Sequence, residues 1–220
     1  LTGDNAAGGE LELRGVKLAH KLHPEVLGKK VELVVADNKS DKAESASVAA
    51  RLIEKDKVCA LIGTYGSSLA MAAGNIVKEA KVPAIGTSCT NPQVTANNDY
   101  YFRACFIDPF QGTVMANYAY KQGARKVAIV QEVSNDYSVG LAKFFKEAFI
   151  KLTNDPDCII DIANYQTGDK DFTAILTNLK AKNPDAVFAP GNFTESALLI
   201  KQAHQLGINV PFMGGDTWET

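Results

Sequence analysis

Several features that mark common functional classes are missing from this sequence. Its 220 residues include three histidines, one tryptophan and four cysteines, and no two cysteines have the C-x-x-C spacing of zinc or thioredoxin-type sites. No run of about 18 apolar residues predicts a membrane span, and no signal peptide is recognisable. The formal net charge of −2 gives no electrostatic case for binding nucleic acid. These absences leave a globular chain, 46% hydrophobic, that can bury a real core.

Motifs for cofactors, metals and catalysis are also missing. There is no G-x-G-x-x-G or P-loop, and no His/Cys/Asp cluster has metal-ligand spacing, so neither a cofactor nor a metal is expected. The segment 66–70 nearly matches the G-x-S-x-G elbow of hydrolases, and Ser68, Asp185 and His204 follow in the usual order. However, His204 falls inside a predicted helix and Asp185 precedes a strand. We therefore expect no catalytic residue. Ester turnover that Ser68→Ala abolishes would support the hydrolase alternative.

The cysteines offer little chemistry. Cys59 and Cys158 lie inside apolar runs, where buried thiols are expected. A bridge between Cys89 and Cys105 is possible, but the sequence alone does not decide whether it forms.

The most informative feature that is present is an internal repeat at an offset of 128 residues. The offset relates Asp41 to Asp169, Lys42 to Lys170, Gly63 to Gly191, Ser68 to Ser196 and Gly86 to Gly214. A repeat at a fixed offset constrains the architecture, and this offset is the size of a small domain. We therefore expect two similar domains whose matching loops share one site.

Short apolar segments alternate with amphipathic ones, which is the pattern of βαβ units with a parallel sheet. Strands are expected at 31–36, 58–62, 82–85, 126–131, 158–163, 186–189 and 210–213. Helices are expected at 41–55, 67–80, 137–152, 169–181 and 194–205. With right-handed crossovers, this order predicts an α/β fold of two similar doubly wound parallel-sheet lobes.

The two lobes are expected to divide at Ile107, which gives domains 1–107 and 108–220. Residues 100–106 look extended, and Asp108-Pro109 is predicted to cap a helix that runs to Lys121. No low-complexity linker separates the lobes, so a hinge is expected between them.

Four loops are candidates for ligand binding, because ligands of open parallel sheets bind beyond the carboxyl ends of strands. They are residues 63–68, 86–92, 191–195 and 214–217. In the first two loops, which belong to the first lobe, hydroxyls and free helix N–H groups suit a carboxylate. In the last two loops, which belong to the second lobe, the carboxylate of Asp216 suits an ammonium, and the offset relates Asp216 to Ser88. This asymmetry favours an α-amino acid. The structural alternatives are a serine N-cap and an ordinary Gly-Gly-Asp turn.

Several stretches together match a known family. They are Leu1-Thr2-Gly3, Gly15-Val16-Lys17-Leu18-Ala19, Leu61 to Ser68, Thr90-Asn91-Pro92, Asp108 to Gly112, Asp136 to Ala142, Gly168 to Phe172, Gly207-Ile208 and Phe212 to Asp216. In these stretches the chain resembles the type I periplasmic substrate-binding proteins of ABC transporters, in particular the leucine/isoleucine/valine-binding group. The resemblance also implies one further strand before Leu1 and a return segment after Thr220. Without them, the first lobe is expected to have unpaired edges and exposed apolar faces, and the fragment to be unstable or to associate.

The resemblance assigns roles to individual residues. Ser67 matches a serine that holds the ligand carboxylate, and Thr90 a threonine that binds the carboxylate and amino groups. Ser88 matches a residue whose carbonyl receives the ammonium. Tyr137 matches a tyrosine that closes over the ligand, and Asp216 an acid that pairs with the ammonium.

Other positions bear on ligand specificity. Tyr65 and Cys89 lie in the first two loops and are further candidate ligand contacts. Asn192 stands where branched-chain binders often carry tyrosine, and Gly8 where one of them carries tryptophan. Both changes remove aromatic wall from the pocket expected for the ligand side chain.

The implied function is that of an extracytoplasmic receptor, in the periplasm or as a cell-surface lipoprotein. It would bind a small aliphatic or branched-chain α-amino acid, close on it, and deliver it to the permease of an ABC transporter. The full-length protein is expected to be a monomer. The alternative is a ligand-sensing domain of a receptor or transcription regulator with the same fold.

Overall fold

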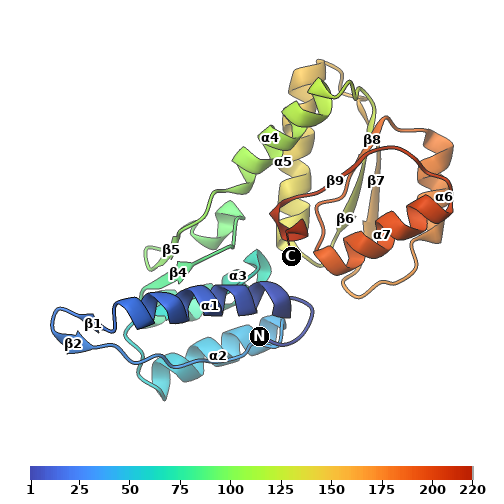
Figure 1. The fold of residues 1–220 in the computed structure, drawn as a ribbon. Coiled ribbons are helices and arrows are strands. Elements are labelled where there is room, and N and C mark those ends of the chain that lie inside the picture. Colours follow the sequence, from blue (N-terminus) through green and yellow to red (C-terminus); the bar gives the residue numbers. More distant parts are fainter. Residues whose placement is uncertain (220) are drawn as a thin grey trace. The chain divides into compact units, whose positions relative to one another are not determined.

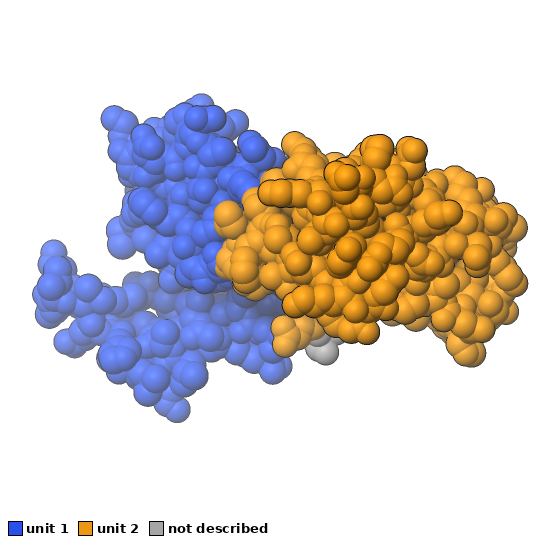
Figure 2. Space-filling view, turned by 90° about the horizontal axis from the view of Figure 1, so that it is seen from above, with its two compact units in different colours: residues 1–105 blue, residues 106–220 orange. Residues whose placement is uncertain are grey.

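The computed structural model describes residues 1–219, which form two compact units (Figure 2). Unit 1 comprises residues 1–105 and unit 2 begins at Phe106, so the expected boundary at Ile107 lies at the second residue of unit 2. No helix within residues 1–219 is long and apolar enough to cross a membrane. Helices and parallel strands alternate in both units.

Unit 1 is built on a small parallel sheet with the strand order β3-β4-β5 (Figure 1). Its elements are α1 (Ala6–Leu22), β1 (Glu25–Val26), β2 (Lys29–Lys30), α2 (Lys42–Glu54), β3 (Leu61–Ile62), α3 (Ser67–Ala80), β4 (Ala84–Gly86), the 3-10 helix η1 (Pro92–Val94) and β5 (Tyr101–Arg103). Strands β1 and β2 form a separate antiparallel hairpin. The bounds of α3 are those expected, and Asp41 caps α2 by accepting the N–H of Glu44 at 2.8 Å.

The strand expected at residues 31–36 is not formed. The segment has no ladder partner among the described residues, and Val34 and Val35 are 44% and 47% exposed. A β-branched sequence becomes a strand only where a neighbouring strand supplies hydrogen bonds, and β3 pairs with β4 alone. For the same reason, the strand expected at 58–62 shortens to Leu61–Ile62.

An apolar cavity of about 820 Å³ lies within unit 1, beside the unpaired edge of β3. Residues 31–36 and 58–64 line it, together with side chains from α1, α2 and α3. Ile62, Ile85 and Phe102 stand in register across the three strands, and all three are exposed. Parallel sheets are normally covered on both faces, so these exposed side chains mark an uncovered face. Unit 1 therefore has the unpaired edge and exposed apolar face that were expected.

Unit 2 contains a longer parallel sheet with the strand order β7-β6-β8-β9 (Figure 1). Its elements are α4 (Asp108–Lys121), β6 (Val127–Glu132), α5 (Asp136–Thr153), β7 (Ile159–Tyr165), α6 (Thr173–Lys182), β8 (Ala186–Phe188), α7 (Phe193–Gln205), β9 (Phe212–Met213) and the 3-10 helix η2 (Asp216–Trp218). Helices α4 and α5 cover one face of the sheet and α6 and α7 the other, with a buried cluster beneath each pair.

The repeat seen in the sequence recurs in the structure. The order α2-β3-α3-β4 of unit 1 corresponds to α6-β8-α7-β9 of unit 2. The offset of 128 relates Ala84, the first residue of β4, to Phe212, the first residue of β9. In both units the last two strands of this order pair in parallel. The repeat therefore preserves a scaffold.

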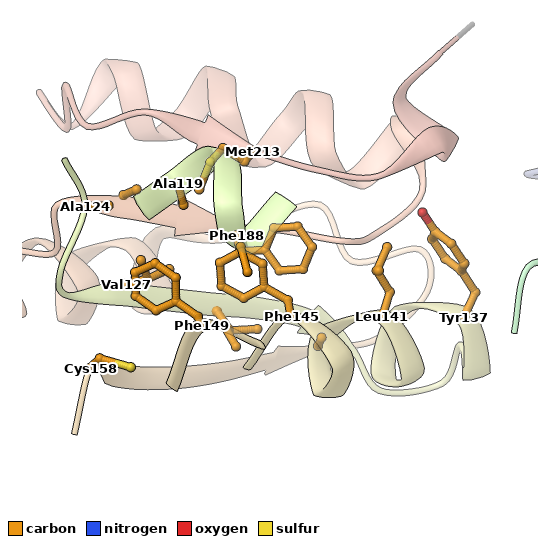
Figure 3. Close-up of a cluster of buried hydrophobic side chains, with 14 residues drawn as sticks. Ala119, Ala124, Val127, Tyr137, Leu141, Phe145, Phe149, Cys158, Phe188 and Met213 are labelled. Atoms are coloured by element: carbon orange, nitrogen blue, oxygen red, sulfur yellow. The ribbon is translucent and has the colours of Figure 1, made fainter. Parts of the chain in front are cut away.

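Aromatic stacking fills the core between α5 and the sheet in unit 2 (Figure 3). The ring of Phe145 stacks on Phe188 with 4.0 Å between centroids, and on Phe149 with 5.5 Å. At the other end of this cluster, Leu141 and Tyr137 project from α5 (Figure 3). Tyr137 therefore joins the core to the carboxyl edge of the sheet.

Three local expectations are wrong. The first is that Asp108 caps α4. Asp108 is instead the fully buried first residue of the helix, and Ile107 occupies the N-cap position. Helix α6 starts at Thr173 because the carboxylates of Asp169 and Asp171 accept local backbone N–H groups and stabilise a turn instead.

Cys59 is the third. It is exposed because the extended segment around it lacks a neighbouring strand, whereas Cys158 is buried as expected. The four cysteines, all within the described residues, form no disulfide, so the possible Cys89–Cys105 bridge is not formed.

Helices α4 and α5 approach closely at Gly112, and this contact generates a prediction. A Cβ at position 112 would lie 2.7 Å from the backbone nitrogen of Phe145. Gly112→Ala should therefore destabilise unit 2 by about 1–3 kcal/mol, although alanine favours helix by about 1 kcal/mol.

The matched control is Gly15→Ala in α1, where a new Cβ would meet nothing within 4 Å and should stabilise slightly. Urea denaturation of both variants measures the difference. If Gly112→Ala were as stable as Gly15→Ala, the close packing would be contradicted.

Candidate functional site

In unit 1, two predicted site residues lie side by side at the start of α3. Ser67 is the first residue of α3, and its Oγ accepts the N–H of Asn91 at 3.1 Å. This bond holds the loop after β4 beside the N-terminus of α3. Thr90 directly precedes Asn91 in that loop. Both Ser67 and Thr90 are 1% exposed, and Thr90 Oγ1 has no hydrogen-bond partner among the described residues. The Thr90 hydroxyl is therefore available to a ligand oxygen or ammonium.

The same loop holds a carboxylate that the sequence analysis missed. The hydroxyls of Thr87 and Ser88 both donate to Oε1 of Glu12, which projects from α1. Burial raises the pKa of Glu12, and the two hydroxyl bonds oppose this rise. The first lobe was expected to offer hydroxyls and helix N–H groups, and Glu12 adds a carboxylate to them. Nothing in the sequence marks Glu12, because it lies in a helix rich in charged residues.

Arg103 is a second missed residue of unit 1. Its guanidinium donates to the carbonyls of Cys89 and Asn91 at 3.0 and 2.9 Å, and to Thr95 Oγ1 at 2.7 Å. A planar guanidinium can hold several loop acceptors at once. The β4–η1 loop is therefore tied down from β5. The extended segment that contains Arg103 was predicted, but the hydrogen bonds of the Arg103 guanidinium were not.

Cys89 and Tyr65 were both candidate ligand contacts. Cys89 is fully buried in the unit 1 core, and burial raises the pKa of its thiol to about 12. The Cys89 thiol therefore packs against its neighbours, with Sγ against Gly86. The ring of Tyr65 lies over Gly8, where an added Cβ would be 2.3 Å from Tyr65 Cε2. The Tyr65 ring therefore occupies the space into which a side chain at position 8 would project.

In unit 2, Tyr137 and Asp216 are brought together from positions 79 residues apart. The hydroxyl of Tyr137 donates to Asp216 Oδ1 at 2.7 Å, and the N–H of Asp216 donates to Gln111 Oε1 at 2.7 Å. Burial, and then the charge of Asp216, raise the pKa of Tyr137 well above its ordinary value. Tyr137 therefore remains a neutral donor. Gln111 belongs to the recognised Asp108 to Gly112 stretch, but its role was not predicted.

The turn that carries Asp216 is anchored to the loop after β8. Thr217 Oγ1 donates to the carbonyl of Gly191 at 2.8 Å, and Trp218 Nε1 donates to Ser196 Oγ at 2.9 Å. A Cβ at Gly215 would lie 2.1 Å from the Tyr137 hydroxyl. The two loops predicted in the second half are therefore one connected structure.

Asn192 is nearly buried at the N-cap of α7 and makes no side-chain capping bond. Two buried acids lie close by, Glu132 at the end of β6 and Glu195 in the first turn of α7. Asp216 is thus not the lone carboxylate that the sequence suggested. Burial raises the pKa of Glu132, and the charge of Glu195 raises it further.

Asp185, which belongs to the hydrolase alternative, has local hydrogen-bond partners. No group of three or more His, Cys, Asp and Glu side chains within residues 1–219 could hold a metal ion. The carboxylate of Asp185 accepts the N–H groups of Arg125 and Lys126, each at 2.8 Å, at the amino edge of the sheet. Asp185 is thus occupied far from the loops at the carboxyl edge.

The comparisons with known proteins agree with this architecture. A family model described as "Periplasmic binding protein" matches residues 1–220. The chain is 32% identical, over 98% of its length, to an amino acid binding protein of Pseudomonas aeruginosa, of which it covers 58%.

Solved structures are similar over nearly the whole chain. A leucine binding protein, LivK, from Thermotoga maritima has 41% identity and a TM-score of 0.93, with 99% of this chain and 61% of that one covered. LivJ from Streptococcus pneumoniae, in complex with isoleucine, has 36% identity and a TM-score of 0.89, with 99% and 62% covered. A solute binding protein of Rhodopseudomonas palustris, in complex with 4-hydroxybenzoate, has 26% identity and a TM-score of 0.89, with 100% and 60% covered.

The chain spans roughly 60% of the length of these proteins. Their structures confirm the predicted α/β class with type I parallel-sheet lobes. The chain belongs to the periplasmic binding protein family, and its resemblance to the leucine/isoleucine/valine-binding group is confirmed.

Proposed function

We propose that this chain provides the ligand-binding residues of an extracytoplasmic receptor for a small aliphatic α-amino acid, which an ABC transporter then receives. The observation that carries the proposal is the Asp216 carboxylate, oriented by Tyr137 and by Gln111. A carboxylate held in this way favours a cationic ligand group. Charge-assisted hydrogen bonds of this kind are about twice as strong as neutral ones.

The opposite charge of an amino acid would bind to unit 1. Ser67 opens α3, where the free N–H groups and the helix dipole favour an anion. The unpaired hydroxyl of Thr90 lies beside it. The proposal therefore assigns the ligand carboxylate to Ser67 and Thr90, and the ligand ammonium to Asp216 and the carbonyl of Ser88.

The side chain of the ligand is the least constrained part of the proposal. A relative is bound to isoleucine, and another similar structure is bound to 4-hydroxybenzoate, which has a carboxylate but no ammonium. The fixed carboxylate of Asp216 favours the amino acid, because an aromatic acid would leave Asp216 without a charge partner. Asn192 adds a polar group, and Tyr65 an aromatic one, for the ligand side chain to meet.

A thermal-shift screen tests the ligand class. At 100 times its dissociation constant, a ligand of the native state stabilises it by about 2.7 kcal/mol, which is several degrees in midpoint. We expect leucine, isoleucine or valine to raise the midpoint, and 4-hydroxybenzoate to leave it unchanged. No shift with any of the twenty amino acids, or a shift with benzoates alone, would contradict the proposal.

Removing the carboxylate of Asp216 tests its role directly. Asp216→Ala should weaken amino-acid binding by about 2–5 kcal/mol, since the ligand ammonium would remain desolvated and unpaired. Calorimetry measures the change. Glu147→Ala, at an exposed acid on α5, is the control that should bind like the wild type. Wild-type affinity in Asp216→Ala would exclude Asp216 from the site.

A further inference from the structure

One buried carboxylate collects hydrogen bonds from two loops at the carboxyl edge of the unit 2 sheet. Glu132, the last residue of β6, is 1% exposed. Its Oε2 accepts Asn135 Nδ2 at 3.1 Å, and its Oε1 accepts the hydroxyl of Thr167. The donors come from the loops that follow β6 and β7.

The bond to Asn135 leads to Tyr137. While its Nδ2 donates to Glu132, Asn135 Oδ1 accepts the N–H of Tyr137 at 3.0 Å. Rotating this amide by half a turn would break both bonds, so Glu132 fixes the orientation of the Asn135 cap. Tyr137 in turn donates to Asp216 at 2.7 Å. Glu132 is therefore linked to Asp216 by hydrogen bonds at both ends of Tyr137, one to its backbone N–H and one from its hydroxyl.

The other contacts hold the neighbouring loops in place. The N–H of Glu132 donates to Ser138 Oγ at 2.9 Å, which fixes the strand end against α5. Glu195 accepts the N–H of Gly168 at 2.9 Å, one residue beyond Thr167. Two acids on different elements therefore clamp the β7–α6 loop.

We propose that Glu132 is a positioning residue, whose carboxylate sets the orientation of Tyr137 for ligand binding. This role rests on the function proposed above, although the orientation itself can be measured without a ligand. Burying a carboxylate is costly, and the charge of Glu195 on α7 adds to the cost. Tyr165 on β7 also faces Glu132, whose charge helps to raise the pKa of the phenol and keep it neutral. An apolar side chain at this position would avoid that cost but would hold neither of the two loops.

The first test measures backbone hydrogen exchange by NMR in the ligand-free chain. Glu132→Ala should accelerate exchange of the Tyr137 amide by roughly three- to tenfold, the value of one net hydrogen bond. Glu132→Gln should restore most of the protection, because its carbonyl can accept from Asn135 while its amide donates to Thr167. Gln131→Ala, which removes an exposed bond to Asn164, is the control. Unchanged exchange in Glu132→Ala would overturn the proposal.

The second test is a double-mutant cycle on leucine affinity, measured by calorimetry. Glu132→Ala and Asn135→Ala should each weaken binding by about tenfold, and the double variant should be no weaker than either, because both break one chain of bonds. Additive losses would overturn the proposal. If Glu132→Ala does not fold, Glu132→Gln and Asn135→Ala decide, and wild-type protection of Tyr137 in Asn135→Ala would overturn it. If the wild type binds none of the amino acids, the proposed function fails, whereas hydrogen exchange still decides the positioning role.

Discussion

The hydrogen bond between Tyr137 and Asp216 is the contact on which the structure of the unit 2 site depends. It forms only because four parallel strands end at one edge and deliver their loops to the same place. The glycines around it are required by space, since a Cβ at Gly215 would collide with the tyrosine hydroxyl. Core packing of α5 below and the buried acid at position 132 beside it hold the tyrosine from two directions.

The two units use a common scaffold for different chemistry. Each pairs its last two repeated strands in parallel and places a helix start beside a loop. In unit 1 that position offers hydroxyls, with Glu12 holding two of them from behind. In unit 2 it offers a carboxylate that a phenol and a backbone bond orient. The repeat thus explains the common geometry, and the differences at single positions explain why the two units present different polar groups.

The elements with strong periodicity were predictable from sequence, and the helix over Ser67–Ala80 is an example. The loops were predictable because parallel topology fixes where strand ends meet. The buried acids were not, because a glutamate on a surface and one that holds two loops look alike in one sequence. Glu12, Glu132 and Glu195 are recognised only when their partners, distant in the chain, are placed around them.

The failed strand at residues 31–36 has a related cause. Its residues have strand propensity, but a strand forms only in a pair, and no described strand pairs with this segment. In unit 2, where each predicted strand has a partner, all the predicted strands form. Propensity was therefore a sufficient guide only where the sheet supplied the hydrogen bonds.

Because the Tyr65 ring packs on Gly8, substitutions at these two positions depend on each other. A larger residue at position 8 cannot be added unless Tyr65 is also reduced or moved, because the two would occupy the same space. A bulkier side chain at position 8 therefore requires a simultaneous change at position 65. Libraries that vary the two positions together would reach combinations that single-site libraries exclude.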